Sequence, residues 1–155
     1  MIKNKKKITI MKYIILLLLL LLVGCSSVEY NVYDSVTKNP VKDALVLIYN
    51  RNTPEHVVAC VSDANGKFFI KSEPDIILVG KNGFALEAVG KYSSKNIYLN
   101  GIEKRIEQMK NNLNHYDHNN KILLPIFLLN KLPTNSNYYK DWKEYTQYLK
   151  TQYKR

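Results

Sequence analysis

Short apolar or alternating runs, separated by turn residues, fill the middle of the chain. Valine, isoleucine, tyrosine and phenylalanine recur in segments of four to six residues, and Asn, Gly, Pro or Asp stands between successive segments. This spacing is typical of strands in an all-β sandwich. We therefore predict a β-sandwich over residues 28–100, with seven strands at Glu29–Tyr33, Ala44–Tyr49, His56–Val61, Lys67–Ile70, Asp75–Val79, Ala85–Val89 and Asn96–Leu99.

Two of these strands lack the alternation of a half-exposed strand. In Ala44–Tyr49 and in Ile76–Val79, apolar residues stand at successive positions. Because neighbouring side chains of a strand point to opposite faces of the sheet, both faces of these strands require burial. We expect the residues after position 100 to cover the outer face.

From residue 101 the apolar residues follow a helical period. They stand at i, i+4, i+7 and i+11, with charged residues between them, at Ile102, Ile106, Met109 and Leu113. This pattern predicts an amphipathic helix of about three turns. The next apolar segment, Ile122–Leu129, contains Pro125, so it forms either an extended piece or a bent helix.

A last helix is predicted from Tyr138 to Tyr153. Its bulky residues fall near one face and include Tyr138, Trp142, Tyr145 and Leu149. Such a stripe is either a packing face or a partner-binding face, since tyrosine and tryptophan are enriched at interfaces. We expect the helical extension to pack on the sandwich, and keep these four residues as candidates for partner binding.

The N-terminus has the pattern of a secretory signal. Lysines are followed by a leucine-rich run that ends in Leu22-Val23-Gly24-Cys25. This ending resembles the lipobox of bacterial lipoproteins, which implies cleavage before Cys25 and a diacylglyceryl group on its thiol. The alternative is an uncleaved membrane anchor, for which the apolar run is short against the ~20 residues that a spanning helix needs.

The leader sets the expected organisation and location. We predict a cleaved signal peptide at 1–24, a lipidated N-terminus and sandwich at 25–100, and a helical extension at 101–155. Ser26, where an aspartate would follow the lipidated cysteine in other lipoproteins, resembles the outer-membrane sorting pattern of proteobacteria. The expected location is the cell envelope, lipid-anchored in the outer membrane and facing the periplasm.

Much of the positive charge belongs to this leader. The chain has 23 basic and 13 acidic residues, and five of the lysines precede Cys25, so residues 25–155 carry 18 basic residues against 13 acidic ones. A net charge of +5 without a basic stripe does not favour nucleic acid as a partner. Cys60 is then the only free thiol. It is interpreted as a small buried residue of a strand, with an intermolecular disulfide or a reactive thiol as alternatives.

Two turn motifs flank the central strands. The first reads Pro40-Val41-Lys42-Asp43-Ala44 before an apolar run, and the second reads Ser62-Asp63-Ala64-Asn65-Gly66-Lys67-Phe68. In these residues the chain resembles the carboxypeptidase regulatory-like domain, a small transthyretin-like β-sandwich. Asp43 departs from that family, which usually has glycine there. The resemblance implies a fold and not an activity.

Candidate chemistry is sparse. His115, Asp117 and His118 are weak candidates for metal binding, because zinc normally takes three or four protein ligands from spaced positions. Asp63 and Asn65 suit turn chemistry better than calcium binding. No Gly-x-Ser-x-Gly motif is present, and the free cysteine lies in a predicted strand and not beside a histidine at a helix start. We therefore expect no cofactor and no enzymatic activity.

These observations favour a binding or structural module of the envelope. Its expected partners are the membrane, through the lipid on Cys25, and a protein or an envelope glycan. Two alternatives belong to other classes. One is a periplasmic immunity protein that binds and inhibits a toxin effector, and the other is an outer-membrane anchor of a secretion machine.

Overall fold

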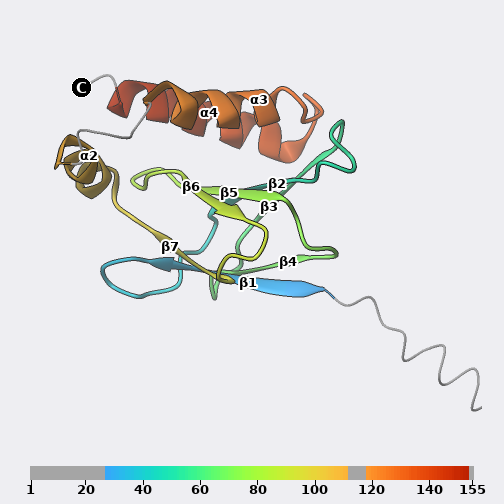
Figure 1. The fold of residues 1–155 in the computed structure, drawn as a ribbon, viewed down its shortest axis with the longest axis horizontal. Helices are drawn as coiled ribbons and strands as arrows, with labels where there is room; N and C mark the ends of the chain where they lie inside the picture. The colour runs from blue at the N-terminus through green and yellow to red at the C-terminus, as the bar shows by residue number, and fades with distance from the viewer. Residues whose placement is uncertain (1–26, 112–117, 154–155) are drawn as a thin grey trace, which may run out of the picture.

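The computed structural model describes residues 27–111 and 118–153 (Figure 1). Seven strands precede three helices. The strands are β1 (Val28–Asp34), β2 (Leu45–Tyr49), β3 (Val57–Val61), β4 (Lys67–Ile70), β5 (Ile76–Gly80), β6 (Glu87–Gly90) and β7 (Asn96–Leu99). The helices are α2 (Ile102–Asn111), α3 (His118–Leu129) and α4 (Asn137–Gln152).

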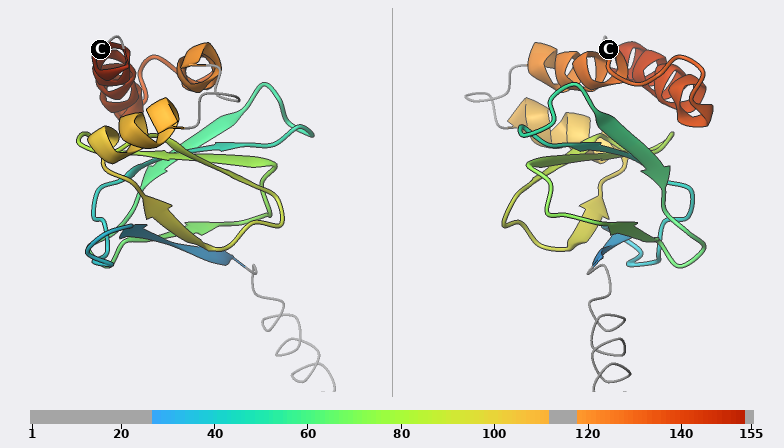
Figure 2. Two further views of the ribbon diagram at one scale, coloured as in Figure 1. Left: turned by 60° about the vertical axis from the view of Figure 1, so that its left-hand side comes forward. Right: turned by 90° about the vertical axis from the view of Figure 1, so that its right-hand side faces the viewer.

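The strands form two sheets that face each other (Figure 2). One sheet has three strands in the order β4-β1-β7, and the other has four in the order β3-β2-β5-β6. All neighbouring strands are antiparallel except β1 and β7, which run parallel with Val32 opposite Ile97. Each of the two sheets therefore has an inner face, turned to the other sheet, and an outer face.

An apolar core fills the space between the sheets. Alternate residues of each strand point into it, as the pleat of a strand requires. Its buried members are Tyr30, Val32, Val41, Ala44, Val46, Ile48, Phe68, Ile70, Ile77, Val79, Ile97 and Leu99.

A second apolar core lies on the outer face of the four-stranded sheet, beneath the helices (Figure 2). Leu47 of β2 and Leu78 of β5 are fully buried there, against α3 and α4. The other buried members are Val57, Ala85, Leu86, Ile102, Leu128, Leu129, Leu132, Trp142, Tyr145 and Leu149. The prediction of a seven-strand β-sandwich with a helical extension packed on it is confirmed.

The segment with Pro125 is helical and not extended. Residues 118–129 form α3, and Pro125 lies inside it. Proline cannot donate a backbone hydrogen bond within a helix, and this omission normally costs ~3 kcal/mol. Burial of Leu128 and Leu129 against the sheet offsets that cost at the end of the same helix. The first helix ends at Asn111 in the structure, and Leu113 lies outside the described residues.

Candidate interaction surfaces

The aromatic stripe of α4 is a packing face. Trp142, Tyr145 and Leu149 are almost fully buried, and only Tyr138 is partly exposed. While α4 lies on the sheet, the three buried side chains are therefore not accessible to a partner. This burial supports the packing alternative, because the stripe covers the apolar outer faces of β2 and β5, and partner binding through these residues stays a prediction.

Tyrosine hydroxyls fix α4 to the turn between β5 and β6. The Tyr145 hydroxyl donates to the carbonyl of Phe84 at 3.1 Å, and the amide of Gly83 donates to the Tyr148 hydroxyl at 3.2 Å. Burial raises the pKa of Tyr145 well above its usual value, so this hydroxyl stays protonated and remains able to donate its hydrogen bond. At the start of the helix, the Ser136 side chain accepts from the amide of Tyr138 and caps it.

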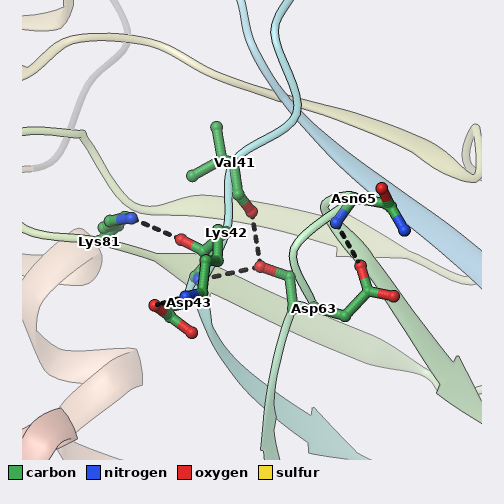
Figure 3. Close-up of polar contacts among 8 residues, drawn as sticks. Val41, Lys42, Asp43, Asp63, Asn65 and Lys81 are labelled. Atoms are coloured by element: carbon green, nitrogen blue, oxygen red, sulfur yellow. Dashed lines mark hydrogen bonds and ion pairs between the residues drawn. The ribbon is translucent and has the colours of Figure 1, made fainter.

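The two turn motifs are structural. The buried Ser62 hydroxyl donates to the carbonyl of Val41 at 2.6 Å and accepts from the amide of Ala44 at 2.9 Å. It thereby joins the turn before β2 to the end of β3. One carboxylate oxygen of Asp63 accepts from the amides of Asn65 and Lys67, both at 2.8 Å, and Figure 3 shows the contact with Asn65. These contacts are the turn chemistry that the sequence favoured over calcium.

Backbone conformation explains two residues of these motifs. Gly66 has a φ of 73°, and a Cβ there would overlap the carbonyl oxygen of Val32. Asp43 has a φ of 53°, which is the left-handed region that favours glycine. Aspartate is among the few other residues that tolerate this region. Aspartate at position 43 is therefore compatible with the conformation of this turn.

A shallow cleft of about 460 Å³ opens between α4 and the ends of β2 and β3. It is lined by Asp43, Leu45, Val61, Lys81, Asn82, Tyr138, Asp141 and Glu144. The Lys81 ammonium donates to the carbonyl of Lys42 at one wall (Figure 3). The side chains that line the cleft include three carboxylates and one lysine, but neither a histidine nor a cysteine.

Within residues 27–111 and 118–153, no helix lies on the outer face of the three-stranded sheet (Figures 1 and 2). We call it the bare face, and its outward side chains are Glu29, Asn31, Tyr33, Lys67, Phe69, Asn96 and Tyr98. Phe69 is 57% exposed and Tyr98 is 44% exposed. This face was not predicted from the sequence, although the alternation of polar and apolar residues in Glu29–Tyr33 is a signal for it.

The side chains of the bare face hold one another in place. The rings of Tyr33 and Tyr98 stack with centroids 5.8 Å apart, and the Lys38 ammonium lies 4.8 Å from the centre of the Tyr98 ring. Between β1 and β7, the side-chain amide of Asn31 donates to the side-chain oxygen of Asn96 at 3.2 Å.

An ion pair completes the face. The Lys67 ammonium lies 2.9 Å from the Glu29 carboxylate, and this pairing raises the pKa of Lys67. With the aromatic stack, the pair makes a preorganised surface with exposed aromatic rings between polar groups.

The remaining predicted site residues have simple positions. His115 and Asp117 lie outside the described residues, as do Leu22, Val23, Gly24 and Cys25. His118 begins α3. Among the residues that the structure describes, no group of three or more His, Cys, Asp or Glu side chains is arranged to hold a metal ion.

Cys60 lies in β3 and packs against the core between the sheets. Burial raises the pKa of its thiol to about 11, so at neutral pH it is almost wholly in the weakly reactive thiol form. Its position agrees with the interpretation as a small apolar residue of a strand.

Two further findings bear on identity and location. No helix within residues 27–111 and 118–153 is both long and apolar enough to span a membrane. No protein-family model and no curated protein matches this chain.

Proposed function

We propose that the chain is an envelope lipoprotein, anchored through a lipid on Cys25, whose sandwich is a non-enzymatic binding module. The leader and the Leu22-Val23-Gly24-Cys25 ending support the anchor. Several acyl chains on one cysteine hold a protein durably on a bilayer. The pattern at Ser26 supports an outer-membrane position facing the periplasm. The resemblance of the turn motifs to the carboxypeptidase regulatory-like domain agrees with a non-catalytic role.

The observation that carries the proposal is the bare face. Helices bury the outer face of one sheet, whereas the other outer face leaves Phe69 and Tyr98 open to solvent. Tyrosine and phenylalanine are enriched in the centres of protein interfaces, and polar side chains surround them. The stacked Tyr33 and Tyr98 rings are already ordered, so binding loses little side-chain entropy there. A protein partner fits this composition, with an envelope glycan as the other outcome of the test.

Site-specific photo-crosslinking in living cells tests the proposal. A photoreactive amino acid is placed in the full chain at Tyr98 or at Phe69, and the matched controls carry it at Val36 or Val58. These control residues are also apolar and well exposed, at 68% and 58%, and neither is on the bare face, because Val36 is in the β1–β2 turn and Val58 is in β3 of the other sheet. We expect one discrete protein adduct from the two bare-face positions and none from the controls.

The outcomes separate the interpretations. The identity of the crosslinked protein distinguishes a toxin effector from a component of a secretion machine. Adducts on peptidoglycan in place of protein would make the partner a glycan. Equal adducts from all four positions, or none from the bare face, would overturn the assignment of this face. Mass spectrometry of the mature N-terminus tests the anchor separately, because loss of residues 1–24 and an acylated Cys25 are both visible in the mass.

A further inference from the structure

Three loops gather at the end of the sandwich where β1 begins. They are residues 50–56, 71–75 and 91–95, and Asp75 ties them together. Its amide donates to the carbonyl of Tyr49 at 3.1 Å, and its carbonyl accepts from the amide of Lys91 at 3.2 Å. Its carboxylate accepts from the amide of Arg51 at 2.6 Å. We call these loops, together with the start of β1, the proximal end.

The start of β1 belongs to the same end by its pairing. Val28 lies opposite Ile70, the last residue of β4, so the chain reaches the sandwich beside loop 71–75. Figure 1 shows the start of β1 and the β2–β3 and β4–β5 connections on one side of the molecule. The far end holds the β1–β2 turn with Val36.

Tyr92 is the unusual residue of the proximal end. Its side chain is 89% exposed, and its φ is 69°. It occupies the third position of the turn Gly90–Ser93, which the Ser93 amide closes by donating to the carbonyl of Gly90 at 3.1 Å. A positive φ at this position normally selects glycine or asparagine, and a bulky residue there is strained. Such strain in a native protein is typical of functional sites.

The distance to the proposed lipid is short. Three residues of extended chain, from Cys25 to Val28, span at most about 11 Å. The headgroup region on each side of a bilayer is roughly 5–7 Å thick. If Cys25 is acylated, the proximal end therefore lies against the headgroups. Tyrosine is enriched at this level of membranes because its ring is apolar and its hydroxyl is polar.

We propose that the proximal end rests on the phospholipid surface, with the Tyr92 ring at the level of the headgroups. This inference rests on the proposed lipid anchor. The Lys91 ammonium lies 5.5 Å from the centre of the Tyr92 ring. Lys71, Lys91 and Lys95 are exposed and lie beside the headgroup phosphates. Arg51 is a fourth cation at this end, against the three acids Glu55, Glu73 and Asp75, so the net charge is small and the aromatic ring provides the specificity.

The arrangement has a consequence for the proposed binding face. The strands run away from the proximal end, so a sandwich that rests on this end stands upright on the bilayer. The bare face is then perpendicular to the membrane and open to a partner.

Fluorescence quenching on vesicles tests the proposal. The lipidated full chain is reconstituted in vesicles of phosphatidylethanolamine and phosphatidylglycerol that carry a spin label on the headgroup. One variant is Tyr92→Trp and the matched control is Val36→Trp, at the exposed far end. Trp142 is buried and common to both, so the signal of the unsubstituted chain is subtracted. We expect a blue shift and strong quenching for position 92, and neither for position 36.

A second pair of variants guards against misfolding. Ser94→Trp reports from the same loop, and we expect its quenching to weaken when Tyr92→Gly is added, because the ring no longer orients this end even though the lipid on Cys25 still tethers it. Glycine relieves the strain, so the thermal midpoint of the double variant should be equal or higher. Equal quenching at positions 92 and 36, or no loss with Tyr92→Gly, would overturn the proposal. A chain that fails to sediment with vesicles and has the mass of the unacylated protein would instead refute the anchor.

Discussion

The two outer faces of the sandwich are built from strands of similar length, but only one of them is covered. On the four-stranded sheet, Leu47 and Leu78 are fully buried beneath the helices. On the three-stranded sheet, Phe69 and Tyr98 are open to solvent, and a polar network lies between them. The difference shows that the strands, and not the helices alone, determine which face receives the helical layer.

The physical cause is the pattern along each strand. β2 and β5 have apolar residues at successive positions, so exposure of their outer faces to water is unfavourable. β1 alternates, and its outward Glu29 and Asn31 are polar. A helix packed on the bare face would remove an ion pair and an amide pair from water, and the desolvation cost would exceed the free energy gained from apolar contacts there. The apolar stripe of α4 therefore has one favourable place to pack.

The largest expected effect is on α4. Trp142→Ala should lower the free energy of unfolding by about 3–5 kcal/mol, because it leaves a large cavity under the helix. Tyr98→Ala on the bare face should cost less than about 1 kcal/mol, as is usual for surface positions. Urea unfolding followed by circular dichroism measures both. Similar losses for the two variants would mean that the faces do not differ in the way that the structure indicates.

A glycine pair tests how closely α4 approaches the sheet. A Cβ at Gly80 would overlap the Tyr145 ring, whereas a Cβ at Gly90 has its nearest neighbour, the Ser93 hydroxyl, at 3.9 Å. Gly80→Ala should therefore cost about 1–3 kcal/mol through overpacking. Gly90→Ala should change stability by about 0.5 kcal/mol or less. If both variants unfold at the wild-type urea concentration, α4 is not seated on β5 in solution.

Two ion pairs provide a smaller contrast. The Glu87 carboxylate accepts from Asn100 at 3.1 Å and lies 3.6 Å from Arg105 of α2, with both charged side chains about four-fifths buried. Glu87→Ala should cost about 1–2 kcal/mol, because it removes charge-assisted contacts from a partly buried site. Glu29→Ala breaks the pair with Lys67 on the bare face and should leave stability unchanged within error.

The free energy of unfolding, measured in low and in high salt, distinguishes the Glu87–Arg105 pair from the Glu29–Lys67 pair further. Any contribution of the exposed pair should disappear in high salt, while that of the Glu87 pair should persist. A larger loss from Glu29→Ala than from Glu87→Ala would contradict the difference in burial.

The strands and the covering helices could be predicted because their patterns are local. Lys67–Ile70 and Asn96–Leu99 have the same bounds in the structure as in the prediction, since turn residues mark both ends. The apolar outer positions of β2 and β5 predicted a cover before any helix was placed. The helix with Pro125 could not be decided, because burial in the second core outweighs the local cost of the proline.

The interaction surfaces were harder to predict than the fold. Alternation in β1 marks a face turned to solvent, but the pairing that brings Tyr33 beside Tyr98 depends on a contact 65 residues apart in the chain. The strain at Tyr92 has no signal in the sequence, because a tyrosine at that turn position is against the usual preference. The stripe of α4 is visible in the sequence, but its role could not be decided there, since the same residues suit packing and partner binding.

The smallest expected effect concerns the edge of the covered sheet, where Cys60 lies in β3. Burial raises the pKa of its thiol from 9.0 to about 11, so the folded chain holds the proton more tightly than the unfolded chain. This contribution to stability is complete below pH 9 and is lost as the pH rises toward 11. In a Cys25→Ser variant, whose only thiol is Cys60, alkylation by iodoacetamide at pH 8 should be at least about tenfold slower in the folded chain than in urea. The folded rate should continue to rise above pH 9, where the unfolded rate levels off. Equal rates in both states would mean that β3 opens readily, so that the sheet would be protected on its face and not at its edge.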